Sequence, residues 1–258
     1  FVCGVDVGRD MPVYELDRFD AVLLCGGAGQ PRDLSVTGRN LPGVRFAVPF
    51  LAEATRRVLA GKAEEKTLSG HKVVVIGGGD TGNDCVGTSI RLGASSVVQL
   101  EIMPPAPGTR AADNPWPRWP ILLKTDYGQQ EAIWMYGSDP RSFEVTAVSI
   151  LGDEVNGVTG IETAGVEWVT TERGHAPRPI ESTIRRQDAT DVLIAMGFVG
   201  AETYLPEALE VALDRNKHMT SRTGIFAAGD MRTGQSLVVR AEADAKAAAD
   251  AIERYLIK

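Results

Sequence analysis

The chain has 258 residues, of which 43% are hydrophobic and 24% charged, enough apolar sequence for one or two folded domains. Its formal net charge of -7 provides no basic field to attract a phosphate backbone, so we expect no nucleic-acid partner. No apolar stretch approaches the roughly 20 residues of a membrane helix, and no signal-peptide pattern is present, so we expect a cytoplasmic protein without membrane contact.

The three cysteines, Cys3, Cys25 and Cys85, include no Cys-x-x-Cys pair. This excludes a redox-active dithiol motif and a zinc ribbon, and three thiols are too few for an iron–sulfur cluster within this sequence. Each cysteine lies in or beside apolar sequence, so we expect three small buried side chains. We predict no metal site.

The N-terminal sequence from Phe1 to Val5 reads as a strand already under way, so we expect the chain to be part of a longer protein. A second apolar stretch, beginning at Phe19, ends in the glycines Gly27 and Gly29. Arg32 stands where a dinucleotide-binding loop would need its third glycine, which favours a buried strand that leaves the core through a turn. Helical spacing of apolar residues then predicts a helix over 49–59.

The most informative segment runs from Val73 through Ile76, a β-branched run, into a Gly-x-Gly-x-x-Gly turn and helix-compatible sequence. In such a turn the first glycine allows the tight bend, the second lets a pyrophosphate approach the backbone, and the third lets the helix pack on the sheet. The helix N-terminus supplies free N–H groups to the phosphates. The predicted nucleotide contacts are Gly77, Gly78, Gly79, Asp80, Thr81 and Gly82; the alternative is a glycine-rich turn that binds nothing.

The next predicted strand covers 95–103 and carries Glu101 near its end. An acidic residue about 20 positions beyond the glycine loop can bind the ribose 2′-hydroxyl of NAD and repel the 2′-phosphate of NADP. Glu101 is equally compatible with a solvated carboxylate, and the nearby Arg110 could instead neutralise a phosphate. The choice between NADH and NADPH therefore stays open.

Residues 104–120 are rich in proline and form neither a helix interior nor a central strand. We expect a structured loop in which Trp116 and Trp119 pack on their own domain. Alternating apolar residues then predict strands over 143–151 and 158–169, and an apolar run predicts a buried strand over 191–197 that ends at Gly197.

Near the end of the chain, a short apolar strand from Thr223 leads to Gly229 and Asp230. From Gln235, a long helix with many alanines is predicted to reach Leu256. Asp230 is a candidate ligand of a cofactor hydroxyl, although a carboxylate that caps the next turn is the alternative for this segment alone.

Taken together, these segments resemble a flavoprotein of the glutathione-reductase type, in which an NAD(P) domain is inserted into an FAD domain. More narrowly, residues 73–83, 100–105 and 113–120 resemble the small (beta) subunit of glutamate synthase. The resemblance implies an α/β fold with a Rossmann-like three-layer (ββα) NAD(P)H-binding domain at 66–197. This domain is expected to interrupt a partial FAD-binding domain formed by 1–65 and 198–258.

The resemblance also implies the chemistry. Hydride passes from NADPH or NADH to FAD, and electrons pass through iron–sulfur clusters to a large (alpha) subunit that forms L-glutamate from L-glutamine and 2-oxoglutarate. No protein acid, base or nucleophile is needed, so no catalytic residue is predicted. The residues expected to contact cofactors, besides the loop and Glu101, are Gly27, Gly29, Gly197, Gly229, Asp230, Gln235, Ser236 and Leu237.

Two features depart from the family pattern. The family's own N-terminal FAD loop and its iron–sulfur cysteines are not among these residues, so the chain resembles the C-terminal portion of the subunit. The segment 242–246 also replaces the family's Glu-Gly-Arg-like sequence near the flavin.

Three other functions remain open. They are a related flavin electron carrier, such as a ferredoxin-linked oxidoreductase or the flavin portion of dihydropyrimidine dehydrogenase, a simple NAD(P) dehydrogenase, and a nucleotide-binding module that is inactive as a fragment.

Overall fold

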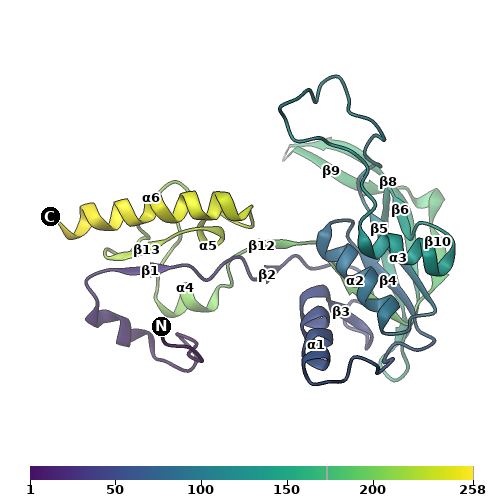
Figure 1. Cartoon of the computed structure of the whole chain (residues 1–258), viewed down its shortest axis with the longest axis horizontal. Coiled ribbons are helices and arrows are strands. Elements are labelled where there is room, and N and C mark those ends of the chain that lie inside the picture. Colours follow the sequence, from purple (N-terminus) through teal and green to yellow (C-terminus); the bar gives the residue numbers. More distant parts are fainter. Residues whose placement is uncertain (173, 258) are drawn as a thin grey trace. The chain divides into compact units, whose positions relative to one another are not determined.

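The computed structural model describes residues 1–172 and 174–257, and the chain divides into two compact units (Figure 1). Unit 1 consists of Phe1–Arg32 and Phe198–Lys258, and unit 2 consists of Asp33–Gly197, so the second unit is an insertion within the first. The sequence placed the first boundary at residue 65, and this position is wrong. Strand β3 (Val44–Phe46) pairs with a strand near the end of unit 2, and this pairing carries residues 33–65 into that unit.

Unit 2 is built on a five-stranded parallel sheet in the order β3-β11-β4-β5-β6. Besides β3, its strands are β4 (Lys72–Ile76), β5 (Ser96–Glu101), β6 (Arg141–Phe143) and β11 (Asp191–Ile194). Strand β4 lies between β11 and β5 and is covered on both faces, which explains its unbroken apolar run. The strand that follows β4 in the sequence, β5, pairs with one edge of β4, whereas the much later strand β11 pairs with its other edge. Such a change of direction in strand order leads us to expect a crevice at the carboxyl ends of β4 and β11.

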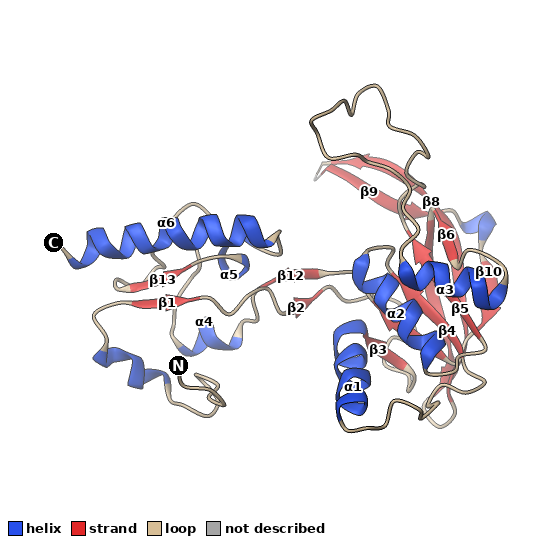
Figure 2. Cartoon of the chain, in the orientation of Figure 1, coloured by secondary structure: helices blue, strands red, loops and turns tan. Residues whose placement is uncertain are grey.

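Two further layers cover the two faces of this sheet (Figure 2). Val73 and Val75 pack against the helices α1 (Ala47–Leu59), α2 (Asp80–Arg91) and α3 (Tyr127–Tyr136). Val74 and Ile76 pack against an antiparallel sheet of β7 (Val145–Asp153), β8 (Gly157–Thr171), β9 (Gly174–Pro179) and β10 (Arg185–Asp188), with the short helix η2 (Glu181–Thr183) before β10. The predicted three-layer ββα arrangement is confirmed.

Unit 1 has a small core of its own. Strand β1 (Val22–Leu24) pairs in parallel with β13 (Ile225–Ala227), and β2 (Gln30–Pro31) pairs with β12 (Phe198–Gly200). Leu24, Ile225 and Met231 are buried together, and the helices of the unit are η1 (Val13–Arg18), α4 (Tyr204–Ala208), α5 (Asp230–Thr233) and α6 (Val238–Leu256). The strand expected over Phe1–Val5 does not form, because those residues pair with no other strand among the described residues.

Several surface expectations are wrong. Residues 104–120 form the predicted loop, but Trp116 and Trp119 remain 82% and 77% exposed instead of packing on the domain. Of the three free cysteines, only Cys85 is buried, because it lies on the inner face of α2, whereas Cys3 and Cys25 are exposed at the surface of unit 1. Within the described residues, no helix combines the length and apolarity that crossing a membrane would require.

Candidate functional site

The turn between β4 and α2 depends on glycine at two positions. Gly77 has a φ of +127°, and a Cβ atom there would lie 2.2 Å from the carbonyl oxygen of Ala195, at the end of the neighbouring strand. A Cβ atom at Gly82 would lie 2.1 Å from the carbonyl oxygen of Gly77. The first glycine therefore permits the tight bend, and the third brings α2 against the turn, as the motif predicts.

Gly79 differs from these two glycines because the space beside it is open. It is the N-cap of α2, with a φ of -77°, and an added Cβ atom would meet no heavy atom of the described chain within 4 Å. No side chain among the described residues caps this helix, so the first N–H groups, around Asp80 and Thr81, are left for another acceptor. An exposed helix start of this kind, with open backbone in front of it, is suited to a phosphate.

Glu101 lies directly against the glycine turn. A Cβ atom at Gly78 would come within 1.8 Å of Oε2 of Glu101, and Oε1 of the same side chain accepts a hydrogen bond from the Met103 backbone N–H at 2.7 Å. The structure therefore brings the predicted acidic residue and the predicted loop together at the carboxyl end of the sheet. Gly197, with a φ of +78°, follows β11 shortly after Ala195, which contacts the same turn.

Arg110, the alternative phosphate ligand, is engaged elsewhere. Its Nη1 donates to the backbone carbonyls of Asn114 and Arg118 at 2.9 and 3.0 Å. The buried Asn114 side chain bonds the backbone of Trp119 and Ile121 in the same loop. Arg110 thus helps to fold the proline-rich loop on itself.

A buried network of hydrogen-bonded side chains lies beneath the glycine turn and was not predicted. Gln99, on β5, is completely buried; its Nε2 donates to the carbonyl oxygen of Gly77 at 2.9 Å, and its Oε1 accepts from Nε2 of Gln129 on α3 at 3.1 Å. The backbone N–H of Gln129 in turn donates to Oδ1 of Asn83 on α2. The only sequence signal was a glutamine within an apolar strand, which marks a satisfied polar group in a core.

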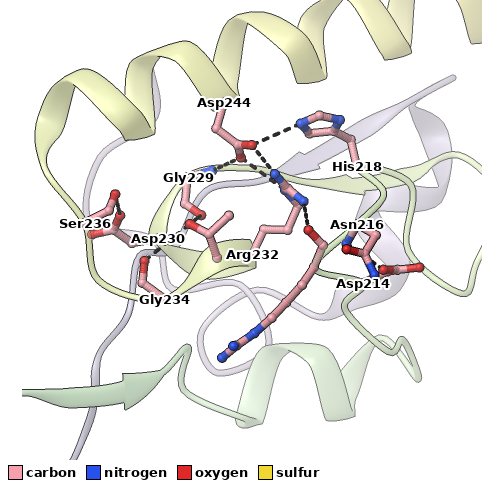
Figure 3. Close-up of polar contacts among 11 residues, drawn as sticks. Asp214, Asn216, His218, Gly229, Asp230, Arg232, Gly234, Ser236 and Asp244 are labelled. Carbon is pink, nitrogen blue, oxygen red and sulfur yellow. Dashed lines mark hydrogen bonds and ion pairs between the residues drawn. The ribbon is translucent and has the colours of Figure 1, made fainter.

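In unit 1, the second predicted site lies where β13 ends. Gly229 has a φ of +66°, a conformation that favours glycine, and its N–H donates to Oδ2 of Asp244 at 2.7 Å (Figure 3). Asp230 begins α5, and its Oδ1 accepts from the Ser236 hydroxyl at 2.7 Å. The Asp230 carboxylate is therefore held between α5 and the segment before α6.

The remaining predicted residues of unit 1 lie on both sides of this turn. Helix α6 begins at Val238 with Leu237 as N-cap, so Gln235 and Ser236 precede the helix instead of opening it. Gln235 accepts from the Phe198 backbone N–H, and an open groove of about 540 Å³ is lined by residues from Thr233 to Ser236 and by α6. Gly27 and Gly29 follow β1, whose partner β13 leads to Gly229; a Cβ atom at Gly27 would meet open space, and Gly29 faces Glu202.

The described residues contain no cluster of His, Cys, Asp and Glu side chains that could hold a metal ion. The histidines have local partners instead. His71 bonds Asp191 and His218 bonds Asp244, and His175 lies 3.5 Å from Thr170. The polar groups described at the two turns, backbone N–H groups and carboxylates, can bind and orient a ligand.

No protein-family model matches the chain. It is 37% identical to the glutamate synthase [NADPH] small chain of Bacillus subtilis, over 100% of this chain and 55% of that protein. It is 39% identical to the small chain of Mycobacterium tuberculosis, over 98% of this chain and 53% of that protein. It also matches the glutamate synthase [NADH] of Saccharomyces cerevisiae at 36% identity, over 100% of this chain and 13% of that protein. The resemblance to the glutamate synthase small subunit is confirmed, and the chain spans about half the length of those bacterial relatives.

Solved structures agree on the fold. The oxidoreductase FprA of Mycobacterium tuberculosis, in complex with NADPH, superposes with a TM-score of 0.71 at 18% identity, over 98% of this chain and 67% of that one. An FAD-dependent pyridine nucleotide-disulphide oxidoreductase from Desulfovibrio vulgaris gives a TM-score of 0.52 at 18% identity, over 92% of this chain and 54% of that one. The chain therefore has the α/β fold of pyridine-nucleotide flavoproteins.

Proposed function

We propose that this homologue of the glutamate synthase small chain belongs to the electron-input subunit of that enzyme. In this function, hydride from NADPH or NADH reduces FAD, and electrons pass on to a large subunit that forms L-glutamate from L-glutamine and 2-oxoglutarate. The observation that carries the proposal is the 37–39% identity to two bacterial small chains over essentially all of this chain. The iron–sulfur clusters of the pathway would be bound outside these residues.

Unit 2 would bind the pyridine nucleotide at the β4–α2 turn. The fit rests on the open backbone at Gly79 and on the uncapped N-terminus of α2, which suit a pyrophosphate. Glu101 lies against the same turn, where a carboxylate can accept hydrogen bonds from ribose hydroxyls. Gly77 and Gly82 would act through the shape of the turn, because a side chain at either position would collide with backbone.

Unit 1 would contribute to the flavin site at the β13–α5 turn. When bound, FAD accepts the hydride and releases electrons singly, which is chemistry that no side chain of this chain supplies. Asp230 would bind a ribitol hydroxyl, and the start of α6 at Leu237 would direct its positive end towards negative charge on the flavin. Gln235 and Ser236 would define the approach to that helix start. The role of the protein is thus to orient two rings and exclude water.

The proposal includes the partner and the location. A separate large subunit is inferred from the relatives named small chains. A cytoplasmic location is supported by three free cysteines, of which two are exposed, because exposed thiols persist where the compartment is reducing.

The test uses the complete subunit that contains this chain. NADPH or NADH should bleach the visible flavin absorbance. The Asp230→Ala variant should lose both the bound flavin and the bleaching. The control variant Asp250→Ala, at an exposed position of α6, should behave as the unsubstituted protein. Addition of the large subunit should make nucleotide oxidation depend on glutamine and 2-oxoglutarate. Oxidation that ignores both substrates would contradict the glutamate synthase function, and unchanged flavin binding in Asp230→Ala would remove Asp230 from the site.

A further inference from the structure

One carboxylate in unit 1 makes four hydrogen bonds to three residues and has no role in the chemistry described so far. Asp244 projects from α6 into the space behind the Gly229–Asp230 turn (Figure 3). Its side chain is only 13% exposed, and that of its main partner, Arg232 on α5, is 9% exposed. A buried charge is costly unless it is paired and hydrogen-bonded, so this arrangement needs a physical reason.

The partners of Asp244 come from three separate segments. Oδ2 accepts from the Gly229 backbone N–H at 2.7 Å and from Nε of Arg232 at 3.1 Å. Oδ1 accepts from Nη2 of Arg232 and lies 3.2 Å from Nε2 of His218. Nη1 of Arg232 donates to the backbone carbonyl of Arg215, which ties the segment before His218 to the same cluster.

These contacts keep the carboxylate charged. Hydrogen bonds from Arg232, with further help from the Gly229 N–H, the Arg232 charge and His218, lower the pKa of Asp244 to about 2. The negative charge also acts on Cys25 after β1, because partial burial of this thiol and the charge of Asp244 both raise its pKa. Asp244 is therefore an anion at neutral pH that faces β1, β13 and α5 from the long helix.

The bond to Gly229 is the contact that bears on the flavin. With its φ of +66° and ψ of -149°, Gly229 directs the chain from the end of β13 into Asp230. The N–H of this glycine is fixed by Asp244, and the carboxylate of the next residue is fixed by Ser236. The direction in which Asp230 points is thus set by two anchors, one of which is on α6.

We propose that Asp244 is a positioning residue of the flavin site, which acts through the Gly229 N–H to orient Asp230 towards the cofactor. The inference rests on the proposed function, because it assumes that Asp230 binds FAD. It goes further by assigning a role to a residue in the segment where the sequence departs from the small-subunit pattern. Asp244 itself would not touch the cofactor.

The test is a double-mutant cycle on the affinity of the complete apo-subunit for FAD, measured by flavin fluorescence. Asp230→Ala and Asp244→Ala should each weaken binding by about tenfold or more, as expected for losing a hydrogen bond to a charged group. If Asp244 acts through Asp230, the double variant should bind FAD no more weakly than Asp230→Ala alone. The proposal would be overturned if the two substitutions raised the dissociation constant of FAD independently, so that their factors multiplied in the double variant. Wild-type affinity of Asp244→Ala for FAD would also overturn it.

Controls separate positioning from stability. Arg232→Gln removes the ion pair but leaves the Gly229 N–H bonded to Asp244, so it should lower the melting temperature while FAD affinity stays within about threefold. A loss of affinity in Arg232→Gln as large as in Asp244→Ala would show a merely structural cluster and refute the inference. If Asp244→Ala does not fold, Asp244→Leu, which has a similar size and no hydrogen-bond acceptor, takes its place in the same cycle. If the wild-type subunit binds no FAD, the proposed function fails instead.

Discussion

The Gly79→Ala substitution tests the nucleotide site without disturbing the fold. Gly79 has a φ of -77° and a ψ of -174°, which alanine adopts without strain, and a Cβ atom there meets no described heavy atom within 4 Å. Alanine is a poorer N-cap than glycine by about 0.5–1 kcal/mol, but it also restricts the unfolded chain by about 0.4–1 kcal/mol. The two effects oppose each other, so the free energy of unfolding should change by less than about 0.5 kcal/mol.

Nucleotide binding should respond quite differently. The new methyl group would occupy the open space in front of the α2 N-terminus, where the backbone has to approach a pyrophosphate. We expect the dissociation constants of NADH and NADPH to rise by at least about tenfold, which corresponds to about 1.4 kcal/mol. The assay is isothermal titration of each nucleotide, together with thermal denaturation of the unliganded protein.

Two other glycines provide the comparison. Gly108→Ala adds a methyl group that also meets open space, but in the proline-rich loop, so stability and affinity should both stay unchanged. Gly82→Ala places its Cβ atom 2.1 Å from the Gly77 carbonyl oxygen, and overpacking of this kind costs about 1–3 kcal/mol of stability. Unchanged nucleotide affinity in a stable Gly79→Ala protein would refute the assignment of this turn as the binding loop.

Three further predictions concern single side chains. Glu101→Gln should improve the affinity for NADPH relative to NADH by about tenfold in the same titrations, because it removes a negative charge beside the turn; an unchanged ratio would place Glu101 away from the ribose. Gln99→Leu should lower the free energy of unfolding by about 2–4 kcal/mol in urea denaturation, since Gly77 and Gln129 each lose a buried partner. The pKa of Asp244, lowered from 3.8 to about 2, should contribute roughly 2 kcal/mol of stability that is present above pH 3.8 and lost as the pH falls towards 2. Melting temperatures of Asp244→Asn between pH 6 and about 3 should therefore fall less steeply than those of the unsubstituted protein, and parallel curves would contradict this.

The sequence predicted the parts of the fold that have a local signature. The apolar run of β4 reflects the burial of this strand on both faces. The glycine spacing reflects two positions, Gly77 and Gly82, where any side chain would collide with a backbone carbonyl oxygen. The placement of Glu101 beside the loop follows from its distance along the chain, because one helix and one strand separate the carboxyl ends of adjacent parallel strands. In each case the residues that determine the structure lie within one β-α-β unit.

Features that depend on distant pairing were missed. The first boundary of unit 2 is set by β3, which pairs with β11 nearly 150 residues later, and no pattern within residues 33–65 reveals that partner. The exposure of Trp116 and Trp119 has a different, local origin. Their loop is folded by Arg110 and Asn114, which bond backbone carbonyls and amides within it, so the tryptophans are not needed for its packing.

Both candidate sites share a structural feature that a sequence motif does not reveal. Beneath the β4–α2 turn, Gln99 bonds the Gly77 carbonyl, and behind the β13–α5 turn, Asp244 bonds the Gly229 N–H. Each side chain belongs to a neighbouring element and fixes a backbone group of a glycine at a sharp turn. Glycine permits such turns but does not hold them, because it loses the most conformational entropy on ordering. A glycine-based site therefore needs an anchor from elsewhere in the fold, and substitutions of these two anchors should loosen cofactor binding even though neither is proposed to contact a cofactor.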